Sequence, residues 1–109
     1  MREADIKRAI SDYLTIQQNM GKLIWFRMNS GKAWVGGEKK YLIQLCPEGT
    51  PDILVIQYGR PIFFEVKSET GKVSTTQEIA MEELEMHGAL CFVVRSVDEV
   101  MTLLEINIG

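Results

Sequence analysis

The segment from Gly49 to Ser68, GTPDILVIQYGRPIFFEVKS, constrains the fold more than any other part of the chain. It contains two short apolar runs, DILVIQ and PIFFEVK, which are separated by the turn-forming residues YGRP. Apolar runs of this length between turn formers are typical of buried strands. Because a turn at Gly59–Pro61 leaves so short a connection, the two strands should pair as antiparallel neighbours within a covered sheet.

Periodicity and turn residues predict the other elements. An apolar stripe at helical spacing indicates an N-terminal helix, and the pairs Thr75–Glu78 and Ser96–Glu99 are interpreted as capping boxes that open two more helices. The predicted order is a helix over 3–18, a strand over 23–31, a hairpin over 33–46 that turns at Gly36–Gly37, strands over 52–57 and 61–67, a helix over 75–87, a strand over 90–95 and a helix over 96–105.

This order predicts an α/β fold with a mixed central sheet and helices on both faces. The step from the strand over 61–67 through a helix to the strand over 90–95 should be a right-handed parallel crossover. With 109 residues and no linker or repeat, the chain is expected to form a single domain over 1–109.

The composition favours a cytoplasmic protein without a membrane span. No apolar run approaches the roughly 20 residues that a span needs, and the N-terminus mixes charges of both signs, unlike a secretory signal. Cys46 and Cys91 are far apart and there is 1 histidine, so reduced, buried thiols are expected rather than a zinc site. The net charge is −3, yet Lys22 to Lys40 is strongly basic, which fits either a solvated hairpin or a basic face.

Three charged residues interrupt the buried strands where apolar residues would be more stabilising. Side chains alternate along a strand, so Glu65 and Lys67 share a face, and antiparallel pairing places Asp52 close to Glu65. Two carboxylates at short range repel each other unless a cation joins them, and oxygen ligands without histidine or cysteine favour Mg²⁺ or Mn²⁺. The alternative is a surface cluster of salt bridges in which Lys67 balances one carboxylate.

A set of motifs occurs in a fixed order along nearly the whole chain. The set consists of an early glutamate on the first helix, RMNSGKAW after the first strand, GTPDILVI, FFEVKSETGKVSTTQ and a closing GALCFVVRS. This set resembles the VRR-NUC domains of the PD-(D/E)XK nuclease superfamily, in particular the stand-alone type of phages and bacteria. A D…ExK pair alone is a weak motif, whereas the complete ordered set is a strong one. The resemblance implies a restriction-endonuclease-like αβββαβ core.

The resemblance also implies a divalent metal centre. In the family, the glutamate of the first helix, the aspartate of PD and the glutamate of ExK hold the ion. These roles fall on Glu3, Asp52 and Glu65, with the backbone carbonyl of Val66 as a further ligand and Mg²⁺ or Mn²⁺ as the cofactor. Glu3 extends the apolar stripe of the first helix and is expected to point toward the sheet. Its alternative is a solvated helix end, where an acid suits the helix dipole.

Two further catalytic roles follow from the resemblance. Lys67 is expected to hold the attacking water or to stabilise the charge that develops on the phosphorane. Gln77 is expected to face inward and orient the water or a phosphate, or else to bond free backbone amides in the first turn of its helix. His87, at the end of that helix, is interpreted as a favourable partner of the helix dipole and not as a catalyst.

Phosphate contacts are expected from the polar segment after the first strand and from lysines near it. Trp34 and Tyr41 are interpreted as hairpin packing or a subunit contact rather than as base-stacking platforms. The predicted DNA-binding residues are Arg27, Asn29, Ser30, Lys32, Lys39, Lys40 and Lys72.

The resemblance implies a metal-dependent, structure-selective DNA endonuclease that leaves a 5′-phosphate. Stand-alone members resemble Holliday-junction resolvases that act as homodimers, so branched DNA such as a four-way junction is the expected substrate and a second copy the expected partner. Size and resemblance suggest a phage or prophage gene expressed in a bacterial host. The alternatives are a flap or general nicking nuclease, and a catalytically silent DNA-binding subunit with the same fold.

Overall fold

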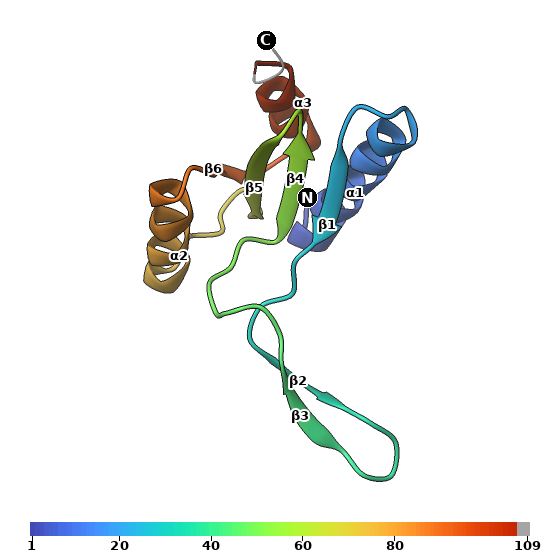
Figure 1. The fold of residues 1–109 in the computed structure, drawn as a ribbon, viewed down its shortest axis with the longest axis vertical. Coiled ribbons are helices and arrows are strands. Elements are labelled where there is room, and N and C mark those ends of the chain that lie inside the picture. The colour runs from blue at the N-terminus through green and yellow to red at the C-terminus, as the bar shows by residue number, and fades with distance from the viewer. Residues whose placement is uncertain (107–109) are drawn as a thin grey trace.

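The computed structural model describes residues 1–106, which form an α/β fold. Figure 1 shows a central sheet with helices on both sides and a narrow hairpin that projects from one end. The elements are α1 (Glu3–Asn19), β1 (Ile24–Arg27), β2 (Lys32–Val35), β3 (Tyr41–Gln44), β4 (Ile53–Gln57), β5 (Arg60–Val66), α2 (Thr75–Met86), β6 (Leu90–Val94) and α3 (Val97–Ile106).

The central sheet has the strand order β1-β4-β5-β6. The neighbours β1, β4 and β5 are antiparallel, whereas β6 pairs in parallel with β5 after the α2 crossover, so the predicted mixed sheet is confirmed. The turn between β4 and β5 is shorter than predicted. It consists of Tyr58 and Gly59, both with positive φ angles (51° and 78°), and Pro61 already lies in β5 opposite Ile56. A two-residue turn of this kind matches the natural twist of the paired strands.

One face of the sheet is covered by α1 and α3. Their apolar stripes pack against the inward residues of β4, β5 and β6, and these side chains are almost completely inaccessible. Burial of each such side chain contributes about 1.5–3 kcal/mol, so this face forms the main core. Its buried members are Ile6, Ile10, Leu14, Leu23, Ile53, Val55, Ile62, Phe64, Val66, Val94, Val100 and Leu104.

The other face is covered only in part, by α2. The backbone carbonyl of Met81 in α2 accepts a weak hydrogen bond from Cys91 Sγ in β6, at 3.7 Å. Within residues 1–106 no helix covers this face of β1 and β4, where Ile24, Phe26 and Ile56 are 44, 44 and 37 % exposed. We call this part of the sheet, formed by these three residues, the open apolar face.

The start of α2 differs by one residue from the predicted capping box. Ser74, not Thr75, caps the helix: its Oγ accepts from the backbone N–H of Gln77 at 3.1 Å, and its own N–H donates to Gln77 Oε1 at 2.9 Å. Neighbouring hydroxyl residues both fit the sequence pattern, which explains the wrong assignment. At α3 the Ser96 hydroxyl accepts from the N–H of Glu99 as predicted.

Both cysteines are free thiols, but they are half-buried rather than fully buried as predicted. Burial raises the pKa of Cys91 to about 11, which makes this thiol a poor nucleophile at neutral pH. None of the helices within residues 1–106 is both long and apolar enough to cross a membrane.

The strands β2 and β3 form a separate hairpin, which we call the arm (residues 32–44). In Figure 1 the arm extends away from the body, and neither of its strands packs against another helix or strand in residues 1–106. Trp34 and Tyr41 on the arm are 68 and 60 % exposed. A two-stranded hairpin alone is marginally stable in water at best, and the other elements of residues 1–106 give the arm no packing support.

Candidate active site

Two carboxylates meet where β4 begins and β5 ends. Ile53 pairs with Phe64, so Asp52 lies opposite Glu65, as the sequence predicts. Asp52 Oδ2 accepts a hydrogen bond from the backbone N–H of Val66 at 2.7 Å, which fixes its side chain against the last residue of β5. The other oxygen, Oδ1, is left to face α1.

The segment before Asp52 is fixed by close packing against α2. Gly49 has a φ angle of +86°, and a Cβ at this position would lie 2.5 Å from the backbone oxygen of Thr76. Any other residue would therefore clash with the first turn of α2 or strain the backbone. This contact and the buried Pro51 hold the entry to β4 in place, and with it the carboxylate of Asp52.

Glu65 is buried, with only 3 % of the residue exposed. Its Oε1 accepts from Gln77 Nε2 at 3.0 Å and lies 3.8 Å from Lys67 Nζ. Its Oε2 is also buried and has no hydrogen-bond partner. Burial, followed by repulsion from Asp52, raises the pKa of Glu65 to about 7, although Lys67 and Lys7 oppose the rise. A buried carboxylate with one unsatisfied oxygen is costly unless a cation or a proton satisfies it.

Lys67 continues the line of β5 and lies on the same face as Glu65, as predicted. Its backbone N–H donates to the carbonyl of Val94 at 3.0 Å, so parallel pairing with β6 extends one residue beyond β5. The side chain is 14 % exposed, and its ammonium lies beside the Glu65 carboxylate. This position is fixed by backbone pairing rather than by a flexible loop.

Gln77 makes the backbone bond that the sequence left as one alternative and also faces inward, onto Glu65, while its role in orienting a water or a phosphate stays a prediction. Its Oε1 caps the backbone N–H of Ser74, while its Nε2 donates to Glu65. The helix cap and the site are therefore joined through a single amide group.

Glu3 does not join the other two carboxylates directly. Its Oε2 pairs with Lys7 Nζ at 3.2 Å, and the same ammonium lies 3.2 Å from Asp52 Oδ1. Lys7 thus links Glu3 to Asp52, and the sequence analysis did not predict its role. The spacing of four residues from Glu3, on the same helical face, is the feature that would have identified it. Burial lowers the pKa of Lys7, but attraction to Asp52 and Glu3 outweighs this and raises it overall.

The predicted convergence of three carboxylates is only partly observed. Within residues 1–106, no three acidic, cysteine or histidine side chains lie close enough together to form a ready metal-binding group. Asp52 and Glu65 do lie together, and the donors are all oxygens, as hard cations require. The unpartnered Oε2 of Glu65 also fits a cation. The role of Glu3 as a ligand remains a prediction, because Lys7 occupies the position between it and Asp52.

The predicted DNA-binding residues fall into two groups. Arg27 and Asn29 line a cavity of about 140 Å³ that also reaches Lys7 and Asp52, and Arg27 Nη2 donates to Ser11 Oγ at 3.4 Å. The remaining residues lie farther out. Ser30, Lys32, Lys39 and Lys40 are on the arm or at its base, and Lys72 is in the loop before α2.

The loop that carries Lys72 is held by Arg95, which the sequence analysis did not single out. Arg95 Nη1 donates to the backbone carbonyls of Ser68 at 2.5 Å and Gly71 at 2.7 Å.

A separate and larger cavity of about 510 Å³ lies under α2, and His87 lines it at the C-cap of that helix. His87 thus lines this cavity and not the one beside Asp52, and its interpretation as a non-catalytic partner of the helix dipole stays a prediction.

Comparison with known proteins gives a consistent result. The family model of the VRR-NUC domain matches residues 3–98. A solved structure of a VRR_NUC domain is similar to this chain, with a TM-score of 0.63 and 25 % sequence identity over 96 % of each chain. No curated protein sequence matches the chain closely enough to count as a relative. Since the family model covers most of its length, the chain belongs to the VRR-NUC domain family, a family of nucleases.

Proposed function

We propose that this protein is a metal-dependent DNA endonuclease that hydrolyses phosphodiester bonds. The observation that carries the proposal is the Asp52–Glu65 pair beside Lys67, in which the buried Glu65 Oε2 has no protein partner. A cluster of salt bridges with a purely structural role should satisfy each buried carboxylate oxygen, because an unpaired one is costly. Membership of a nuclease family supports the same chemistry.

Mg²⁺ or Mn²⁺ is the proposed cofactor, held by Asp52, Glu65 and the backbone carbonyl of Val66, with Glu3 as a further ligand. Such an ion lowers the pKa of a bound water and neutralises charge on the scissile phosphate. Two of the carboxylate oxygens already accept hydrogen bonds from the protein, so the other two are available to bind the ion. The Val66 N–H occupies Asp52 Oδ2 and Gln77 Nε2 occupies Glu65 Oε1, so Asp52 Oδ1 and Glu65 Oε2 are the proposed donors.

Lys67 is the proposed catalytic cation. Its ammonium is largely buried beside the carboxylates, where a fixed positive charge stabilises developing negative charge more than it would in water. It would hold the attacking water or stabilise the phosphorane, and Gln77 would keep Glu65 in position through its amide.

The substrate is proposed to be DNA, bound through phosphate contacts that carry little sequence information. Arg27 and Asn29 are proposed to contact the phosphates nearest the site, since they line the cavity beside Asp52. Ser30, Lys32, Lys39, Lys40 and Lys72 are proposed to extend this contact outward.

We propose branched DNA, such as a four-way junction, as the preferred substrate and a homodimer as the active form. Two features support a second copy as partner: the arm is unsupported by the body, and the open apolar face is uncovered. A two-fold dimer would present two sites to a two-fold junction.

An assay with matched DNA substrates tests the proposal. The protein is incubated with a four-way junction, a flap and a linear duplex of shared sequence, with Mg²⁺, Mn²⁺ or EDTA. Metal-dependent cleavage confined to the junction is the expected result. Cleavage of all substrates would favour a general nuclease. Binding without cleavage under every condition would reject the enzyme in favour of a DNA-binding subunit.

A further inference from the structure

Lys7 contacts the oxygen of Asp52 that the backbone N–H of Val66 does not occupy. The Val66 N–H occupies Oδ2 at 2.7 Å, and Lys7 Nζ lies 3.2 Å from Oδ1. The same ammonium pairs with Glu3 Oε2 at 3.2 Å. Two of the three carboxylates expected to hold a metal ion therefore already share a cation that belongs to the chain.

The surroundings of Lys7 distinguish this pair of contacts from an ordinary surface salt bridge. Its side chain is 35 % exposed, and that of Asp52 is 24 % exposed. Lys7 also lines the cavity of about 140 Å³ next to Asp52, together with Arg27 and Asn29. The ammonium thus has space to leave Asp52 without unfolding any element.

We infer that Lys7 is a positioning residue that competes with a divalent cation for Asp52 and Glu3 and so sets how tightly the site binds metal. The inference rests on the proposed metal site. An ammonium and a divalent ion cannot both approach Asp52 Oδ1 closely, because like charges repel. Metal binding must therefore displace Lys7, and the cost of displacement lowers metal affinity. The adjacent cavity gives the displaced ammonium a place beside the path proposed for the DNA phosphates.

The test is a titration of the full-length protein with Mn²⁺ after treatment with EDTA, followed by calorimetry or by the spin-resonance signal of free Mn²⁺. Lys7→Gln, and Lys7→Met as a second uncharged variant, should bind Mn²⁺ about tenfold more tightly than wild type. Lys7→Arg should keep an affinity close to that of wild type, because it retains the charge.

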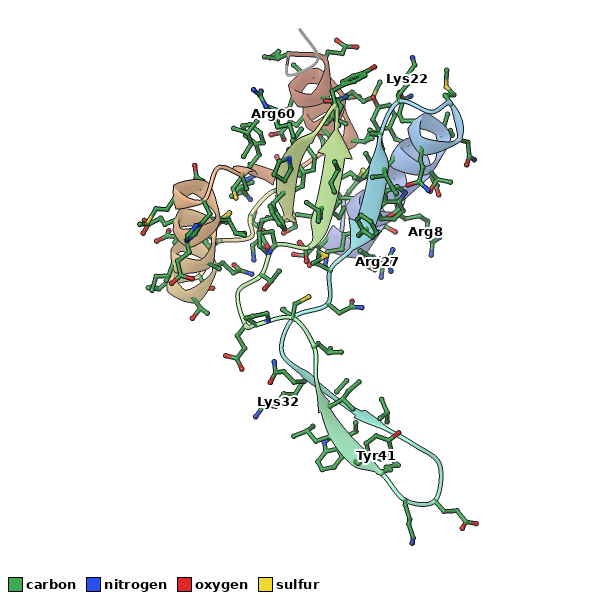
Figure 2. The ribbon with its side chains drawn as sticks, in the orientation of Figure 1. Arg8, Lys22, Arg27, Lys32, Tyr41 and Arg60 are labelled. Carbon is green, nitrogen blue, oxygen red and sulfur yellow. The ribbon has the colours of Figure 1, made fainter. Side chains whose placement is uncertain are left out.

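Arg8→Gln is the matched control. It makes the same change of net charge one residue away, at an exposed position that projects from α1 (Figure 2), and should alter the affinity by less than about twofold. Thermal unfolding gives a second readout. Without added metal, Lys7→Gln should melt at a lower temperature than wild type, and it should gain more on addition of Mn²⁺.

Unchanged or weaker Mn²⁺ binding by both uncharged variants would overturn the inference, as would an equal gain from Arg8→Gln. These outcomes are separable from a failure of the proposed function. If wild type cleaves DNA with Mn²⁺ but the variants bind Mn²⁺ with unchanged affinity, only the role of Lys7 is rejected. Tighter Mn²⁺ binding by the variants without DNA cleavage by any form would reject only the nuclease. If neither wild type nor variants bind Mn²⁺, both proposals fail.

Discussion

The two faces of the central sheet differ in what they bury. The face under α1 and α3 is mainly apolar, with Gln57 as a buried polar residue of β4, and Phe64 and Val55 there are completely inaccessible. The opposite face carries Glu65 and Lys67 on β5 and just after it, and the open apolar face on β1 and β4. One side of a strand therefore supplies stability while the other accepts destabilising charge. The difference explains how the chain tolerates a buried, incompletely paired glutamate: the opposite face holds β5 in place.

The largest expected effect is the loss of stability when a side chain is truncated on the face that α1 and α3 cover. Phe64→Ala should lower the free energy of unfolding by about 3–5 kcal/mol, because it removes a fully buried ring that packs 6.1 Å from that of Phe92. Phe26→Ala, the same change on the open face, should cost about 1 kcal/mol. Denaturant unfolding at low protein concentration measures both. Equal losses would show that the open apolar face is covered in solution. If the free energy of unfolding also depends on protein concentration, a second copy of the chain covers it.

The next largest effect concerns the charged end of the α2 face. Lys67→Ala should lower the cleavage rate at saturating metal by about 10²–10³-fold, because it removes a preorganised positive charge from the site. Folding and DNA binding should persist. Lys22→Ala removes an exposed lysine between α1 and β1, at the opposite end of the central sheet (Figure 2), and is the control for net charge. Cleavage by Lys67→Ala at the control rate would remove this residue from the mechanism.

The sequence was sufficient for the arrangement of Asp52, Glu65 and Lys67. Strand alternation and one short turn determine which residues are opposite and which share a face, so local pattern specifies this part of the site. The same reasoning extended the turn too far along the chain, to Gly59–Pro61, because glycine and proline are both typical of turns. Arg60 instead already pairs with Gln57, and Pro61 follows it opposite Ile56.

The same reasoning could not predict the contact of Lys7 with Asp52 or the direction of the Glu3 side chain. Both depend on how α1 packs against the sheet, on β1 and β5, which is set by contacts between elements distant in sequence. The helical periodicity indicated that Glu3 borders the buried stripe, but it did not show that a lysine one turn later would take the contact with Asp52. The sequence predicted the arm as a hairpin, whereas the lack of packing between its strands and the other elements of residues 1–106 depends on the whole fold.

Removing the charge of Glu65 should show how much this buried carboxylate lowers the free energy of unfolding. The pKa of Glu65 rises from 4.5 to about 7 on folding, so the folded protein binds the proton more tightly than the unfolded chain. This contribution is fully present below pH 4.5 and is lost as the pH rises through 7, which corresponds to about 3 kcal/mol at most. In EDTA, Glu65→Gln should therefore be more stable than wild type at pH 8, and the gain should shrink toward pH 5. Urea unfolding at several pH values measures this, and a gain independent of pH would contradict the assignment.

The smallest expected effect concerns Gln77, which bonds both to the cap of α2 and to Glu65. Two variants distinguish these contacts. Ser74→Ala removes the hydroxyl that caps α2 and should cost about 1 kcal/mol of stability with little change in cleavage. Gln77→Ala loses both the bond to the Ser74 N–H and the bond to Glu65, so it should cost similar stability but also lower the cleavage rate about tenfold. The two variants are compared by thermal unfolding and by single-turnover cleavage. If both lower cleavage equally, Gln77 acts only through the position of α2; if Gln77→Ala alone does, its amide orients the Glu65 carboxylate directly.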